Sequence, residues 1–284
     1  MIKTFLEYCK FDSFFLTKKF TKFFYKFFIE NELKNSFYKN NLHKVLNLKK
    51  INFHKKDIIN EPISKSLKKQ YNPEILDLAR IYNFVKQEKP FTILEFGVGY
   101  STIVMAQALY ENYLSFDKNK KKRIRNSKMF QIYSVDTSKK WIRNTSKKIP
   151  NHLKRFIKFH HSKVETILYN GEVCHVYSKI PNINPEFIYL DGPHPLDPVG
   201  KIYDISFNCK ERTPISADIC FLESTLLPGT NILVDGRTNN VRFLQRNLKR
   251  KYKIKWDRHG DVTFFKLIEK RLGNLNKLGF EFYS

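Results

Sequence analysis

The stretch Ile93-Leu94-Glu95-Phe96-Gly97-Val98-Gly99-Tyr100-Ser101 decides the fold of this chain. It starts as a short apolar run, which is typical of a buried strand, and ends in two glycines separated by one residue. Residues 102–109 have the pattern of a helix. Because glycine has no Cβ, the backbone of such a turn approaches a ligand closely, and the amides at the helix start face it. The segment predicts a strand–glycine turn–helix unit that holds a nucleotide-like ligand.

Two common phosphate-binding patterns do not fit this turn. The dinucleotide fingerprint has a third glycine for close packing of helix on strand, and Thr102 stands at that position. A P-loop needs Gly-Lys followed by Ser or Thr, and no such sequence follows Gly99. The remaining pattern is Glu-x-Gly-x-Gly-x-Ser, with its acid near the end of the strand.

Three more apolar runs also end in an acid. Residues 131–136 end at Asp136, residues 187–191 at Asp191, and residues 231–235 at Asp235. In an open parallel sheet the carboxyl ends of the strands lie along one edge, where ligands bind. We therefore expect these three acids and Glu95 to converge on one crevice.

The C-terminal part predicts a hairpin. Residues 251–256 and 261–268 read as two strands, and a turn as short as 257–260 makes them antiparallel. With the Glu-x-Gly-x-Gly-x-Ser motif and the Asp-Gly-Pro that ends 187–193, this pattern resembles the class I S-adenosylmethionine-dependent methyltransferases. Bacterial small-molecule and sugar O-methyltransferases are the most similar members. The resemblance implies an α/β, Rossmann-like fold: a mostly parallel seven-stranded sheet closed by a C-terminal antiparallel hairpin.

The resemblance covers about residues 71–270, which we expect to form the methyltransferase domain, between a helical extension over 1–70 and a tail over 271–284. It implies S-adenosylmethionine as the cofactor. The implied contacts are Glu95, Gly97 and Gly99 for the methionine end, Tyr100 and Ser101 from the turn, Asp136 for the ribose, and His161 or Ser162 for the adenine.

Two mechanisms for activating an acceptor hydroxyl stay open. In the first, Asp191 orients the acceptor and His194 is the general base, since a neutral imidazole accepts a proton near neutral pH. In the second, Asp191 and Asp235 bind a divalent cation that acidifies the hydroxyl. Related cation-dependent enzymes have Asp-Asn where this chain has Asp235-Gly236, so an asparagine at 239 or 240 would have to replace that ligand. Arg237 is expected to pair with an anionic substrate group or with Asp235.

Three further segments carry expectations. The insertion over 197–214 is a candidate substrate lid, and residues 214–227 are predicted to form a helix. Residues 171–177 have the pattern of a small hairpin arm. The lysine-rich stretch 117–128 is interpreted as a solvated loop, with a polyanion-binding loop as the alternative.

Composition limits the class of protein. The chain has 284 residues, of which 42% are hydrophobic, enough for one α/β domain and an extension. Its apolar runs predict no membrane span, and its N-terminal lysines argue against a cleavable signal peptide. The four scattered cysteines are typical of a reducing cytoplasm. We therefore expect a cytoplasmic protein.

The charge of +25 is spread along the chain and accompanies high Lys, Asn, Ile and Phe, as an AT-rich genome would produce. The positive charge still motivates a nucleic-acid methyltransferase, but the alternative explanation by genome composition makes it only the second hypothesis. Within 1–30, phenylalanines and lysines alternate at helical spacing. This helix either packs on the catalytic domain or a second subunit, or lies on the inner membrane surface. A non-catalytic membrane-associated scaffold is the third hypothesis. The sequence identifies neither the small-molecule or glycan acceptor nor the oligomeric state.

Overall fold

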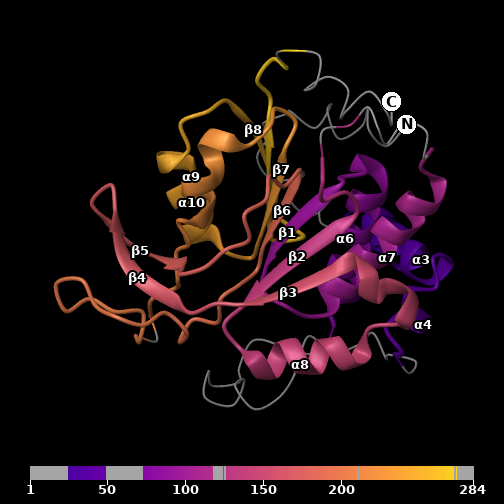
Figure 1. Cartoon of the computed structure of the whole chain (residues 1–284), viewed down its shortest axis with the longest axis horizontal. Coiled ribbons are helices and arrows are strands. Elements are labelled where there is room, and N and C mark those ends of the chain that lie inside the picture. The colour runs from indigo at the N-terminus through magenta and orange to yellow at the C-terminus, as the bar shows by residue number, and fades with distance from the viewer. Residues whose placement is uncertain are drawn as a thin grey trace.

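Figure 1 shows the computed structural model of the chain. The structure describes residues 25–48, 73–117, 124, 126–209, 211–271 and 273. Most of the expected N-terminal helix within 1–30, most of the lysine-rich loop over 117–128, and nearly all of the expected tail over 271–284 lie outside the described residues.

A seven-stranded sheet forms the centre of the fold, in the order β3-β2-β1-β6-β7-β9-β8. The strands are β1 Thr92–Phe96, β2 Gln131–Asp136, β3 Ile157–His161, β6 Phe187–Leu190, β7 Asn231–Asp235, β8 Tyr252–Asp257 and β9 Val262–Leu267. The neighbouring strands β3, β2, β1, β6 and β7 run parallel to one another, whereas β9 is antiparallel to both β7 and β8. The predicted mixed sheet with a C-terminal hairpin is thus confirmed. Strand order reverses between β1 and β6, which is where such sheets open a ligand crevice.

Helices cover both faces of this sheet (Figure 1). On one side lie α3 Glu30–Lys39, α4 Leu42–Val45, α6 Ile75–Glu88 and α7 Tyr100–Ser115. On the other lie α9 Asp218–Leu222 and α10 Thr238–Asn247. A further helix, α8 Lys139–Lys148, contacts β2 and β3. Short turns of other helix types are η1 Tyr25–Ile29, η3 Asn151–Phe156 and η4 Glu223–Thr225. Since both faces are covered, the central strands read as continuous apolar runs rather than alternating ones.

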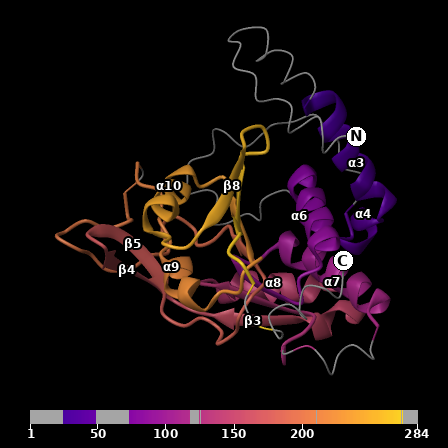
Figure 2. The ribbon, with the colours of Figure 1, turned by 90° about the horizontal axis from the view of Figure 1, so that it is seen from above.

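A separate two-stranded hairpin follows β3, formed by β4 Val164–Tyr169 and β5 Glu172–Tyr177. Its turn residues Asn170 and Gly171 have φ of 48° and 80°, as a tight hairpin turn requires. The predicted hairpin arm is confirmed and is longer than expected. Figure 2 shows it projecting beside α9 and α10.

The described N-terminal residues pack on the domain. Leu33, Phe37, Leu42 and Leu46 are buried in the same core as α6 and α7. The Ser36 hydroxyl also donates to the side chain of Asn83, with an O–O distance of 2.6 Å. Residues 33–46 thus pack on the domain, whereas Phe27 and Phe28 of the stretch 1–30 are exposed, and the role of that stretch stays a prediction. No helix among the described residues is long and apolar enough to cross a bilayer.

The helix predicted over 214–227 is wrong in extent, because only α9 and η4 form there. The backbone before α9 is used differently. The amide of His175 in β5 donates to Ile215, and the amide of Ala217 donates back to His175. Because these backbone groups are bonded to β5, they are not available for the hydrogen bonds of a longer helix.

Candidate functional site

The glycine turn lies at the carboxyl end of β1. Gly97 has φ of +104°, and a Cβ there would lie 3.2 Å from the amide nitrogen of Gly192 in the loop after β6. Above Gly99, in contrast, a Cβ would meet nothing within 4 Å. The amide of Val98 donates to Asp136 over 3.0 Å, which joins the turn to the end of β2. The turn therefore touches the neighbouring loop on one side and leaves open space on the other.

Glu95 is fully buried beneath this turn. Its carboxylate accepts from the hydroxyls of Ser101 at 2.6 Å, Thr102 at 2.6 Å and Ser134 at 2.5 Å. Burial raises the pKa of Glu95 to about 7, although the three hydroxyls oppose that rise. The side chain thus fixes the start of α7 on β1 and β2, and its expected contact with a cofactor stays a prediction.

Asp136 lies at the end of β2, beside the glycine turn. Its oxygens accept from the amides of Val98 and Ser138, at 3.0 and 2.6 Å, and the backbone of Thr137 is a third donor. Burial raises the pKa of Asp136 to about 6. His161 pairs with Asp136 across β2 and β3, and its Nε2 lies 3.0 Å from the carbonyl oxygen of Thr137. The two residues expected to contact ribose and adenine are therefore adjacent.

Two other expected cofactor contacts are engaged with protein groups. The Ser162 hydroxyl donates to the carbonyl of Lys163 and accepts from the amide of Lys179. The Tyr100 hydroxyl accepts from the ammonium of Lys148 in α8 over 3.2 Å. Both side chains thus have protein partners within reach of the crevice, and their expected roles stay predictions.

Asp191 and Asp235 lie at the ends of neighbouring strands. The Tyr189 hydroxyl donates to Asp235 over 2.6 Å. Asp191 is exposed to solvent on one side. The protein atoms around its carboxyl group, and then the negative charge of Asp235, raise the pKa of Asp191. Arg237 donates from Nη2 to the carbonyl oxygens of Asp191 and Pro193, at 2.6 and 2.9 Å. The arginine therefore holds the loop after β6 by its backbone.

That loop turns back toward β2. The carboxylate of Asp197 accepts from the amide of His194 and from the hydroxyl of Thr137. The Nδ1 atom of His194 accepts from the amide of Leu196 over 3.3 Å, which places the proton of the neutral ring on Nε2. Burial lowers the pKa of His194, so the ring is neutral near neutral pH. The expected role of His194 as general base stays a prediction.

A divalent cation finds few ligands here. The amide of Asn239 donates to the Thr213 hydroxyl, while buried Asn240 bonds the backbone of Ser216 through both its oxygen and its nitrogen. Neither amide is therefore turned toward the strand-end acids. Among the described residues, no group of three or more acids, histidines or cysteines is arranged to hold a metal ion. The donor set does not fit the metal-dependent alternative.

The structure adds residues that the motifs did not indicate. Asp77 and Arg80, in the first turns of α6, form an ion pair, and Arg80 also donates to the Tyr25 hydroxyl. Burial is the main cause that raises the pKa of Asp235, and the negative charge of Asp77 raises it further. The positive charge of Arg80 lowers it. An acid and an arginine three residues apart on a helix are too common a pattern to mark a site. Only the packing of α6 brings them toward Asp235.

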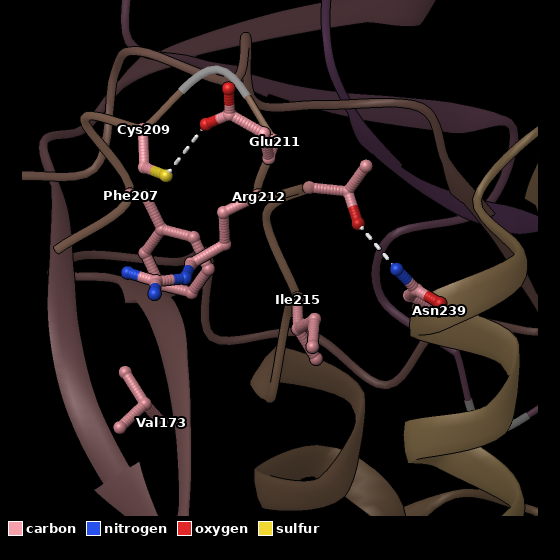
Figure 3. Close-up of a pocket in the computed structure, with 8 residues that line it drawn as sticks. Val173, Phe207, Cys209, Glu211, Arg212, Ile215 and Asn239 are labelled. Carbon is pink, nitrogen blue, oxygen red and sulfur yellow. Dashed lines mark hydrogen bonds between the residues drawn. The ribbon is translucent and has the colours of Figure 1, made fainter. Parts of the chain in front are cut away.

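A recess of about 290 Å³ opens between β5, the segment 207–215 and the start of α10 (Figure 3). Its lining consists of Val173, Phe207, Cys209, Glu211, Arg212, Thr213, Ile215 and Asn239. None of the strand-end acids belongs to this lining. The recess is thus beside the predicted crevice rather than within it.

No family model matches this chain, and no curated protein matches it. Similar folds occur among solved structures. One is the O-methyltransferase TomG from Streptomyces achromogenes in complex with SAM, with 9% identity, a TM-score of 0.39, and coverage of 87% of this chain and 95% of that one. Another is an O-methyltransferase from Bacillus cereus in complex with SAH, with 13% identity, a TM-score of 0.38, and coverage of 87% and 96%. A third is the SAH-bound Podospora anserina methyltransferase PaMTH1, with 14% identity, a TM-score of 0.39, and coverage of 70% and 80%. The fold assignment itself rests on the strand order of the sheet.

Proposed function

We propose that this chain is an S-adenosylmethionine-dependent methyltransferase that methylates a hydroxyl of a small molecule or glycan. The observation that carries the proposal is the edge formed by β2, β1 and β6. There, the Glu-x-Gly-x-Gly-x-Ser turn lies beside Asp136, with open space above Gly99. A carboxylate at this position can accept a hydrogen bond from a ribose hydroxyl.

The residues divide into those that hold the cofactor and those that treat the acceptor. Gly97, Gly99 and the first amides of α7 would hold the methionine end, and Asp136 the ribose. The bound cofactor supplies an already activated methyl group for in-line displacement. The protein then has to position the acceptor and remove its proton.

Asp191 suits that second task. It is exposed at the end of β6 beside the glycine turn, where its carboxylate can accept the proton of an acceptor hydroxyl. His194 would donate from Nε2 to the acceptor, since its Nδ1 is turned to Leu196. Proton removal by Asp191 requires no metal ion.

Calorimetric titration with S-adenosylhomocysteine tests the proposal. Wild-type protein should bind it with micromolar affinity. Asp136→Asn keeps the shape of the side chain but removes one acceptor oxygen, and should lose affinity about tenfold. Asp204→Ala is the matched control, because it removes an almost fully exposed carboxylate. Absence of binding to folded wild-type protein would contradict the proposal.

A further inference from the structure

One face of the β4–β5 hairpin carries a cluster of buried polar atoms without partners. They are the Thr166 hydroxyl, both ring nitrogens of His175 and the Tyr177 hydroxyl. These are four of the seven such side-chain atoms in the described part of the chain. Because buried polar atoms are nearly always hydrogen-bonded in folded proteins, four on one face call for an explanation.

The three side chains lie in a row. Thr166 is paired with His175 across the two strands, so their side chains point to the same face about 5 Å apart. Tyr177 follows His175 by two residues and occupies the same face about 7 Å along the strand. We call Thr166, His175 and Tyr177 the hairpin row.

A single segment, 191–207, covers all three members. Gly200 lies over Thr166, with its Cβ position 3.9 Å from the threonine Cβ. Phe207 packs edge-on against the His175 ring, with 5.8 Å between ring centroids. A Cβ on Gly192 would come within 2.8 Å of the Tyr177 hydroxyl.

This covering segment contains neither a helix nor a regular strand, and Val199 joins it to β4 by two backbone hydrogen bonds, one with Val164 and one with Thr166. It exposes the apolar side chains of Val199, Tyr203 and Ile205. The recess of Figure 3 opens beside it, with Phe207 in its lining. A shift of Phe207 would therefore join the recess to the hairpin row.

The hairpin row is uncharged. Burial, together with the positive charge of Arg237, lowers the pKa of His175 to about 3, so its ring stays neutral and offers one donor and one acceptor. Burial raises the pKa of Tyr177, which keeps its hydroxyl protonated. Each member both donates and accepts hydrogen bonds and is itself uncharged. The charges that act on the row lie outside it: Arg237 on His175, and Asp136, Asp218, Arg237 and Asp197 on Tyr177. Such a surface matches a ligand with several neutral hydroxyl groups.

We infer that the hairpin row is the acceptor subsite and binds an uncharged polyhydroxylated ligand, such as a sugar ring, when residues 198–207 move aside while Arg237 keeps the backbone at Asp191 and Pro193 in place. The location supports this assignment, because Gly192, which covers Tyr177, directly follows Asp191. A ligand on the row would thus hold a hydroxyl near that carboxylate. The inference rests on the proposed function, which makes the edge beside Asp191 the place of methyl transfer.

Two nearly isosteric variants test the inference. Tyr177→Phe and Thr166→Val each remove one hydroxyl without changing the shape of the side chain. Tyr252→Phe is the matched control, since it removes a buried tyrosine hydroxyl from β8, a strand of the other sheet. Binding of methyl glycosides and of myo-inositol is measured by saturation-transfer NMR in the presence of S-adenosylhomocysteine. Glucose 6-phosphate serves as the charged probe, and thermal unfolding is followed in parallel.

Wild-type protein should bind at least one neutral probe more tightly than the charged one. Each row variant should lose about tenfold in affinity for it, with unchanged affinity for S-adenosylhomocysteine and no loss of thermal stability. The control should bind as wild type does. Glycoside binding without S-adenosylhomocysteine binding would reject the proposed function but keep the polyol site.

Three results would overturn the inference. One is that the variants unfold at lower temperature while glycoside affinity is unchanged, which would assign the row to structural water. Another is loss of S-adenosylhomocysteine affinity, which would place the row in the cofactor site. The third is that wild-type protein binds no neutral probe.

Discussion

Replacing Glu95 by glutamine should change how stability depends on pH. The folded-state pKa of Glu95 is about 7, against 4.5 for the ordinary side chain, because its carboxylate is fully buried. The folded state therefore holds this proton more tightly than the unfolded state does. The penalty for ionising the buried group is absent at low pH and grows as pH rises from 4.5 to about 7. A difference of about 2.5 pKa units corresponds to about 3 kcal/mol.

Glutamine is nearly isosteric and cannot ionise. Its oxygen replaces the acceptor for Thr102 and Ser134, while its amide donates to the oxygen of Ser101. Glu95→Gln should match wild type in free energy of unfolding near pH 5, but exceed it by up to about 3 kcal/mol near pH 8. Urea denaturation followed by circular dichroism at both pH values measures this. Glu165→Gln, which removes an exposed carboxylate, is the control. A pH-independent difference between Glu95→Gln and wild type would refute the reasoning.

Three further expectations concern the loop and the strand ends. Gly192→Ala should lower the free energy of unfolding by about 1–3 kcal/mol, because the added Cβ would lie 2.7 Å from the amide nitrogen of Gly97; urea titration measures it, and an unchanged midpoint contradicts the close contact. Arg237→Gln should remove charge-assisted bonds to two loop carbonyls and accelerate amide hydrogen exchange in the loop after β6, while equal exchange rates would show that the arginine does not hold it. Tyr189→Phe should raise the pKa of Asp235 by removing its hydroxyl donor, which carboxyl NMR titration measures; an unmoved pKa argues against that bond.

Much of this fold could be predicted from local pattern. The turn at Gly97 and Gly99 needs residues without a Cβ, and each central strand is an apolar run that stops at a polar residue. These signals lie within a few residues of each other, so the sequence alone determined the strand–turn–helix unit, the strand-end acids and the C-terminal hairpin. The resemblance offered His161 or Ser162 as the adenine contact, and the register of β2 and β3 then pairs His161 with Asp136.

What neighbouring elements do to one another was decided only by the tertiary structure. No local pattern shows that Glu95 is sealed by three hydroxyls or that His194 turns its Nδ1 to Leu196. Arg237 holds loop carbonyls because β6 and β7 are adjacent, although 44 residues separate it from Pro193. The hairpin row is also a product of tertiary packing. The polarity of its members is read from the sequence, but their burial depends on where segment 191–207 folds, and such long-range packing leaves no periodic signal in the chain.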